Sequence, residues 1–206
     1  MPKKTFFHLS KDKQETLIES AKKEFSRVPL HEASIANIIK SAGIPRGSFY
    51  QYFHDKEDLY YYLLNELAEK NNERFTAALK EKEGDLFEAF IDSFSFMMKA
   101  HRNPEYKNFF KNTFLNMNYK KENTLANSMY EESQKNEYSR IIQLINTTNL
   151  NIKDEQELRH ILKIMTAVTF HNLVQSFVKE LSDEESLQNY LLQIQLLKKG
   201  FQKEMN

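Results

Sequence analysis

Apolar residues recur at helical spacing along nearly the whole chain, and this pattern constrains the fold more than any other feature. Ile35, Ile38, Ile39 and Ala42 lie on one helix face, at i, i+3, i+4 and i+7. The 206 residues include only four glycines and four prolines, which leaves few positions for turns between strands. No alternating strand pattern is visible, so the sequence predicts an all-α protein.

The apolar periods predict about nine helices with no internal repeat. The expected segments are 10–27, 35–42, a short helix after Pro45, 56 to the low eighties, 87–98, one or two short helices near 104, 122–145, 154–181 and 183–203. Side chains that accept a hydrogen bond from a free backbone N–H support several of the starts. They are Asp55, Asp154, and the capping-box patterns Asp85-x-x-Glu88 and Ser182-x-x-Glu185.

Composition narrows the function classes. The chain has no cysteine, so neither a disulfide framework nor a Cys-based zinc site is expected. Residues 1–14 lack an apolar run of signal-peptide length, and no stretch approaches the roughly 18 apolar residues of a membrane span, so we expect a cytoplasmic protein without a membrane partner. The net charge is zero, but residues 1–54 carry nine Lys/Arg against five Asp/Glu. This excess permits phosphate binding at one end of the chain, although an ordinary solvated surface would show the same charge.

The segment "GIPRGSFYQYFHDKEDL", residues 43–59, predicts a helix-turn-helix. Gly43 follows the last turn of helix 35–42 and supplies the left-handed conformation that ends a helix. Pro45 suits the first position of a new helix, where its missing N–H would be unpaired anyway. In such motifs the second helix enters the DNA major groove.

The outward residues of that second helix suit DNA. Arg46 lies in its first turn and can pair bidentately with guanine, while Gly47 lets the backbone approach the duplex. Ser48, Tyr50, Gln51 and Tyr52 offer hydroxyls and an amide to phosphates or bases, and Lys56 begins the next helix, whose N-terminus favours phosphate. Spacing alone leaves a half-buried core position open for Tyr50 and Tyr52.

The stretch "ASIANIIKSAGIPRGSFYQYFHDKEDLY" resembles the N-terminal DNA-binding domain of the TetR family of bacterial transcription regulators. The shared positions are Ser34, Ala42, Gly43, Ile44, Gly47, Tyr50, Tyr52, Phe53, Lys56, Glu57 and Leu59. The resemblance covers about residues 10–62. It implies a helix-turn-helix domain over 1–55, a helical ligand-binding and dimerisation domain over 56–206, and double-stranded operator DNA as partner. Carried over by position, the DNA-facing residues are Ser34, Arg46, Gly47, Ser48, Tyr50, Gln51, Tyr52 and Lys56. Pro45 stands where many members have serine, which removes one hydroxyl contact.

The last two predicted helices are expected to form a homodimer interface. The 154–181 helix is apolar on more than one face and needs neighbours on several sides. Paired recognition helices would match a palindromic site. The expected interface residues are Ile161, Met165, Val168, Leu187, Leu191 and Ile194. An internal helix pair in a monomer is the alternative.

A ligand pocket for a small apolar or aromatic effector is expected from the resemblance, since family members bind small molecules between helices of the C-terminal domain. Here these are the helices of residues 85–180. Its candidate lining is Phe87, Phe90, Phe94, Met97, Met98, Phe109, Phe110, Phe114, Met117 and Phe170. Such residues at helical spacing also fit plain core, and a regulator that responds to a protein partner without a pocket is the alternative.

Enzyme chemistry is not expected. His160 and His171 share a helix face, but no carboxylate or cysteine completes a metal site with them. No phosphate-binding glycine loop and no Ser/His/Asp set is visible, so we expect no cofactor. A helical adaptor that binds only protein is the third class, and it would not need Arg46 and Lys56 near helix N-termini.

Overall fold

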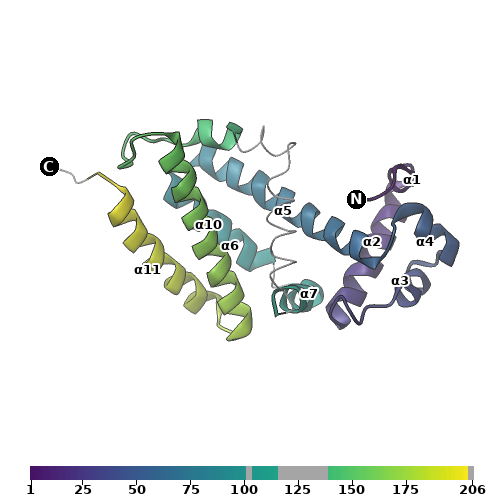
Figure 1. The fold of residues 1–206 in the computed structure, drawn as a ribbon. Helices are drawn as coiled ribbons and strands as arrows, with labels where there is room; N and C mark the ends of the chain where they lie inside the picture. Colours follow the sequence, from purple (N-terminus) through teal and green to yellow (C-terminus); the bar gives the residue numbers. More distant parts are fainter. Residues whose placement is uncertain (101–103, 116–138, 204–206) are drawn as a thin grey trace. The chain divides into compact units, whose positions relative to one another are not determined.

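The computed structural model describes residues 1–100, 104–115 and 139–203. Apart from an isolated antiparallel bridge between Leu150 and Gln202, the regular structure in these residues is helical, which confirms the all-α prediction (Figure 1). The named helices are α1 (Lys4–Phe7), α2 (Lys11–Arg27), α3 (Ile35–Ala42), α4 (Arg46–Tyr52), α5 (Lys56–Glu81), α6 (Leu86–Ala100), α7 (Pro104–Leu115), α10 (Glu155–Val178) and α11 (Asp183–Phe201).

The predicted helices agree with the structure closely, with two differences. Residues 139–144 are helical, whereas most of the expected 122–145 helix lies outside the described residues. Helix α1 was not predicted, because four residues are too few to show a period. The predicted caps are present: Asp85, Asp154 and Asp55 each accept from a first-turn N–H, and Ser182 and Glu185 form a complete capping box.

The described chain forms two compact units. The first contains residues 1–70 and α7, and the second contains residues 71–100 and 139–203. From the sequence we expect one domain over 1–55 and another over 56–206. The compact units are grouped differently, because α7 packs against α2 and the first part of α5 completes the same core. Asn112 of α7 donates to the carbonyls of Phe25 and Ser26 at the end of α2, at 3.0 and 3.1 Å, which caps that helix from outside.

Aromatic rings fill the core of the first unit. Phe6, Phe25, Phe49 and Phe53 are fully or almost fully buried, together with Leu17, Ala21, Ile38 and Leu59. The Phe6 ring lies 5.0 Å from Phe53, and Phe25 meets Tyr60 edge-on at 5.1 Å. The short helices α1, α3 and α4 thereby gain a packed core that none of them could form alone.

The second unit has a separate core, built by α6, α10, α11 and the last part of α5. Phe94 stacks on Tyr190 at 4.1 Å, and the Tyr190 hydroxyl shares a 2.7 Å hydrogen bond with Thr169. Gly84, with φ +82°, forms the turn before α6, and an added Cβ would lie 2.6 Å from backbone atoms of Leu144 and Asn146. Glycine is therefore required at that turn.

Among the described residues, one helix, α10, is long and apolar enough to cross a membrane by composition. Buried residues of this helix, including Leu158, Leu162 and Met165, belong to the core of the second unit. The core helix of a soluble protein passes the same test, so the composition of α10 is weak evidence for a membrane span.

Candidate nucleic-acid interface

The turn between α3 and α4 has the geometry that the sequence predicts. Gly43 adopts the left-handed conformation, with φ +64°, and Ile44 N–H donates to the Ile39 carbonyl at 3.1 Å. Pro45 is the N-cap of α4, so the helix begins one residue later than expected. Together α3, this turn and α4 form a helix-turn-helix.

Helix α4 divides its side chains between the core and solvent. Phe49 is fully buried, whereas Arg46, Gly47, Tyr50 and Gln51 are exposed. A short helix with a buried aromatic anchor and an exposed arginine in its first turn can present that arginine to a groove. The contacts of these residues with DNA remain predictions.

Ser48 and Tyr52 are less exposed to solvent than these four residues. Both are half-buried, and the Tyr52 ring lies edge-on to Phe6 with 6.5 Å between centroids. For Tyr52 this favours the half-buried core position, whereas Tyr50 is on the exposed side of α4.

A buried carboxylate fixes the start of α3. Glu24 of α2 is 5% exposed and accepts from the Arg27 guanidinium at 2.8 and 2.9 Å, from Ser34 N–H at 2.9 Å and from the Asn37 amide at 3.1 Å. The hydrogen bond from Arg27 is the main cause that lowers the pKa of Glu24, with help from Ser34 and Asn37 and against the effect of burial. The ionised carboxylate therefore ties α2 to α3.

Ser34 and Lys56 also contribute to this arrangement. The half-buried Ser34 does not cap α3 with its side chain; its N–H binds Glu24. The Lys56 ammonium donates to the carbonyls of His31 and Ala33, both at 2.9 Å, and so holds the loop before α3. Because an ammonium has three N–H donors, the predicted phosphate contact of Lys56 would use the third while both carbonyl bonds remain.

Sequence reasoning missed residues 3–6 as neighbours of this site. Lys3 and Thr5 donate to carbonyls in the last turn of α4, and Phe6 is fully buried beside Phe53. Two adjacent phenylalanines in an otherwise polar N-terminal stretch were the available signal.

The six expected interface residues of the second unit do not share one environment. Ile161, Met165 and Ile194 are buried in the unit's own core, and Val168, Leu187 and Leu191 are half-buried. The exposed large apolar residues of these helices are Ile164, Phe170, Val178, Leu192 and Leu196. A helix that is apolar on two faces gives one continuous pattern in sequence, so periodicity could not separate its inner from its outer stripe.

The expected pocket residues that the structure describes belong to both units. Phe87, Phe90, Phe94 and Met98 are buried in the core of the second unit, with Met97 packed against it and Phe170 exposed. Phe109 and Phe110 are buried in the first unit, where Phe109 packs beside Phe25 and Tyr60. The Phe114 side chain and Met117 lie outside the described residues.

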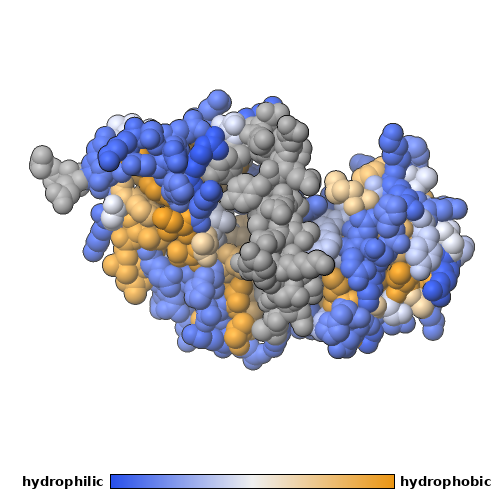
Figure 2. Space-filling view, in the orientation of Figure 1, coloured by the Kyte–Doolittle hydropathy of each residue, from blue (hydrophilic) through white to orange (hydrophobic). Residues whose placement is uncertain are grey.

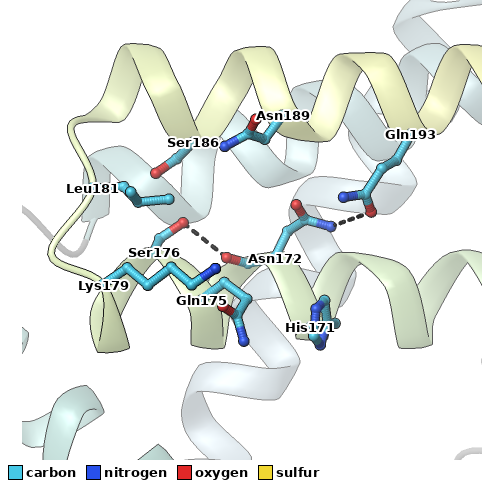
Figure 3. Close-up of a pocket in the computed structure, with 9 residues that line it drawn as sticks. All are labelled: His171, Asn172, Gln175, Ser176, Lys179, Leu181, Ser186, Asn189 and Gln193. Carbon is cyan, nitrogen blue, oxygen red and sulfur yellow. Dashed lines mark hydrogen bonds between the residues drawn. The ribbon is translucent and has the colours of Figure 1, made fainter.

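The cavity between α10 and α11 is polar and has a volume of about 250 Å³ (Figure 3). Its lining includes Asn172, whose amide donates to Gln193 at 2.8 Å, and Ser176, whose hydroxyl donates to the Asn172 carbonyl. Ser186 faces the same space from α11, and its buried hydroxyl has no protein partner in the described structure. Of the expected apolar residues that the structure describes, none lines this cavity.

A second, wider space of about 640 Å³ is lined by residues of 142–158 and by Lys203. None of the described members of the expected set lines this space either. Within the described part of the chain no group of three or more His, Cys, Asp or Glu side chains could hold a metal ion.

The helix-turn-helix, its buried anchor and the exposed face of α4 define a DNA-binding protein of the helix-turn-helix class. Residues 17–63 match the family profile described as bacterial regulatory proteins, tetR family. Residues 85–201, more than half of the chain, match the one described as Tetracyclin repressor-like, C-terminal domain. The chain belongs to the TetR family of transcription regulators.

Solved structures show the same fold. A TetR-family transcriptional regulator from Mesorhizobium loti superposes with a TM-score of 0.61 at 13% identity, covering 93% of this chain and 98% of its own. One from Pectobacterium atrosepticum gives 0.60 at 17% identity, with 96% and 100% covered. One from Streptomyces coelicolor gives 0.60 at 16%, with 92% and 83% covered. No curated protein matches the chain.

Proposed function

We propose that this protein is a cytoplasmic repressor that binds a palindromic DNA operator as a homodimer. The observation that carries the DNA-binding part is the division of α4, with Phe49 in the core and Arg46, Gly47, Tyr50 and Gln51 on the outside. The first turn of α4 presents Arg46, whose guanidinium fits the two acceptors of guanine in the major groove. The repressor role rests on the match of the C-terminal part to the tetracyclin-repressor-like domain.

Exposed apolar side chains on α10 and α11 support the homodimer. Leu192 and Leu196 are 59% and 61% exposed, one turn apart on α11, and Ile164 and Val178 of α10 are 42% and 47% exposed. Figure 2 shows apolar surface gathered over α11. Pairing of α10 and α11 with the same helices of a second copy would remove this surface from water and form a four-helix interface.

The interface that we propose therefore uses the outer stripe of these helices. The half-buried Val168, Leu187 and Leu191 would flank it, whereas Ile161, Met165 and Ile194 support it from the core. A two-fold axis between the copies would pair two recognition helices, which is the arrangement that a palindromic operator requires.

Two candidates remain for the signal that releases the protein from DNA. A small apolar effector fits the ring-rich composition of the second unit and is usual in the family. The packing of the described rings favours the second candidate, a protein partner, because Phe94 stacks on Tyr190 and the Phe75 ring lies 4.8 Å from that of Phe90.

The DNA-binding proposal is tested by selection of duplexes from a random-sequence library, followed by sequencing. We expect a palindromic consensus and a complex of two chains per duplex. Recovery of unrelated sequences with uniform affinity would refute a sequence-specific regulator.

The effector is tested by a thermal-shift screen of apolar and aromatic compounds, followed by titration of the selected duplex with each hit. A compound that raises Tm and weakens DNA binding supports the small effector, because a ligand shifts an equilibrium only by its differential affinity for the two states. Hits that leave DNA affinity unchanged, or no hits, would leave the protein partner as the signal.

A further inference from the structure

The recognition helix α4 is too short to be stable on its own. It has seven residues, with glycine at its second position. Isolated helices of this length are not stable in water, and a helical glycine costs about 1 kcal/mol relative to alanine. The orientation of α4 must therefore come from contacts outside the helix.

The carbonyl groups at the end of α4 identify one source of these contacts. The last four carbonyls of a helix have no partner within it. In α4 the first of them, from Phe49, accepts from the N–H of Phe53 at 2.9 Å. The other three belong to Tyr50, Gln51 and Tyr52, and all three accept from residues at the N-terminus of the chain.

Two residues supply these three donors. The Lys3 ammonium donates to the Tyr50 carbonyl at 2.7 Å, and the Lys3 backbone N–H donates to the Tyr52 carbonyl at 2.8 Å. The Thr5 hydroxyl donates to the Gln51 carbonyl. The ammonium is placed at the negative end of the helix dipole, where a cation is stabilising.

A buried ring holds this segment in place. Phe6 is fully buried and packs at 5.0 Å from Phe53 and 5.5 Å from Tyr62 of α5, so α1 lies beside the end of α4 (Figure 1). Lys4, between the two donors, is exposed and makes no such contact with α4. The segment thus presents Lys3 and Thr5 to α4 and Lys4 to solvent.

We propose that residues 3–6 act as a brace for the recognition helix, with Lys3 and Thr5 as positioning residues for DNA binding. This inference rests on the proposed DNA-binding function of α4. The brace completes the hydrogen bonding of the end of α4 and fixes its angle against α5. The N-terminal segment then contributes to operator affinity without contacting a base.

The test compares Lys3→Met with Lys4→Met, which removes the same charge one residue away. The first measurement is amide hydrogen exchange of the full chain without DNA, which does not depend on the proposed function. We expect Lys3→Met to accelerate exchange in α4 about tenfold, as for the loss of one charge-assisted hydrogen bond, and to leave α2 and α3 unchanged. Unchanged exchange in α4, or equal acceleration in all three helices, would overturn the brace.

The second measurement is affinity for the duplex that the unaltered protein selects, at several salt concentrations. A lysine that neutralises a phosphate lowers the salt slope by about 0.9 when removed. We expect Lys3→Met to weaken binding about tenfold with an unchanged slope, and Lys4→Met to weaken it less. Equal losses, or a reduced slope for Lys3→Met, would mean that Lys3 acts on DNA directly and would overturn the positioning role. If the unaltered protein selects no duplex, the proposed function fails, while hydrogen exchange still decides whether the brace exists.

Discussion

The hydroxyl of Tyr60 donates to the hydroxyl oxygen of Thr113 at 2.8 Å, and this buried bond joins α5 to α7 inside the first unit. Thr113 donates in turn to the Phe109 carbonyl at 2.7 Å. Burial raises the pKa of Tyr60 to about 12, so the phenol is neutral and acts as the donor. A helix distant in sequence from the helix-turn-helix is thereby fixed to its core.

Thr113→Val should destabilise the protein by about 1–3 kcal/mol, because the buried Tyr60 hydroxyl would lose its partner. In the double variant Thr113→Val/Tyr60→Phe neither polar group remains, so most of this loss should be recovered. Urea unfolding of the unaltered protein, of Thr113→Val, of Tyr60→Phe and of the double variant measures this double-mutant cycle. A double variant whose loss equals the sum of the two single losses would show that the bond contributes nothing.

Glu24→Gln should weaken the connection of α2 to α3 and lower the free energy of unfolding by about 1.5–3 kcal/mol near neutral pH. The pKa of Glu24 is lowered in the folded state. The stabilisation from its charge is therefore present above the unfolded pKa and is lost as pH falls through the folded pKa. The difference in free energy of unfolding between the unaltered protein and Glu24→Gln should shrink as pH falls from about 7 to below about 4. A difference that stays constant over this range would exclude the ionised carboxylate as the cause.

Arg46→Ala should weaken binding to the selected duplex by about 1–3 kcal/mol and relax the preference at one base pair in each half-site. If the Tyr50 hydroxyl contacts a phosphate, Tyr50→Phe should weaken binding to DNA of all sequences about equally. Lys13→Ala, an exposed position on α2, serves as the control for loss of charge. Titration of a panel of single-base variants of the duplex measures each effect, and unchanged affinity of both variants would remove these two assignments.

Leu192→Arg together with Leu196→Arg should convert the proposed dimer to monomers, because two charges would enter an apolar interface without partners. Phe96→Arg is the matched control, since Phe96 is also a large exposed apolar residue, 41% exposed, but lies on α6. Sedimentation velocity reports the assembly state. Persistence of the dimer in the double variant would place the interface on another surface. Met165→Arg would not be informative, because Met165 is fully buried within its own unit.

Gly84→Ala should destabilise the second unit by several kcal/mol or prevent its folding. The new Cβ would lie 2.6 Å from two backbone atoms, and the left-handed conformation is itself unfavourable for alanine. Gly200→Ala is the control, because it lies within α11 with nothing near the added Cβ. It should leave stability unchanged or raise it by up to about 1 kcal/mol. Thermal unfolding of both variants compares them, and equal Tm values would contradict the steric argument.

Apart from α1, the sequence by itself determined the named helices, several of their caps and the helix-turn-helix. Local rules decide these features: apolar spacing marks α3, the left-handed Gly43 ends it, and Ser182 with Glu185 starts α11. It also placed Arg46 on the outside of α4, whereas spacing left the position of Tyr50 open and the structure shows it exposed.

Only the tertiary structure decided which helix faces meet. Met165 and Ile164 are adjacent apolar residues of α10, yet one is fully buried and the other is 42% exposed. Phe94 and Phe109 are both buried phenylalanines, yet they belong to separate cores. Lys3 and Lys4 look alike in sequence, and only Lys3 contacts the carbonyl of Tyr50. The physical reason is that hydrophobic burial is non-directional. The spacing of apolar residues shows which face of a helix is apolar, but not which other helix that face packs against. The partner follows from long-range contacts, such as those of Phe6 with Phe53 and of Tyr60 with Thr113, that form only when the whole unit folds.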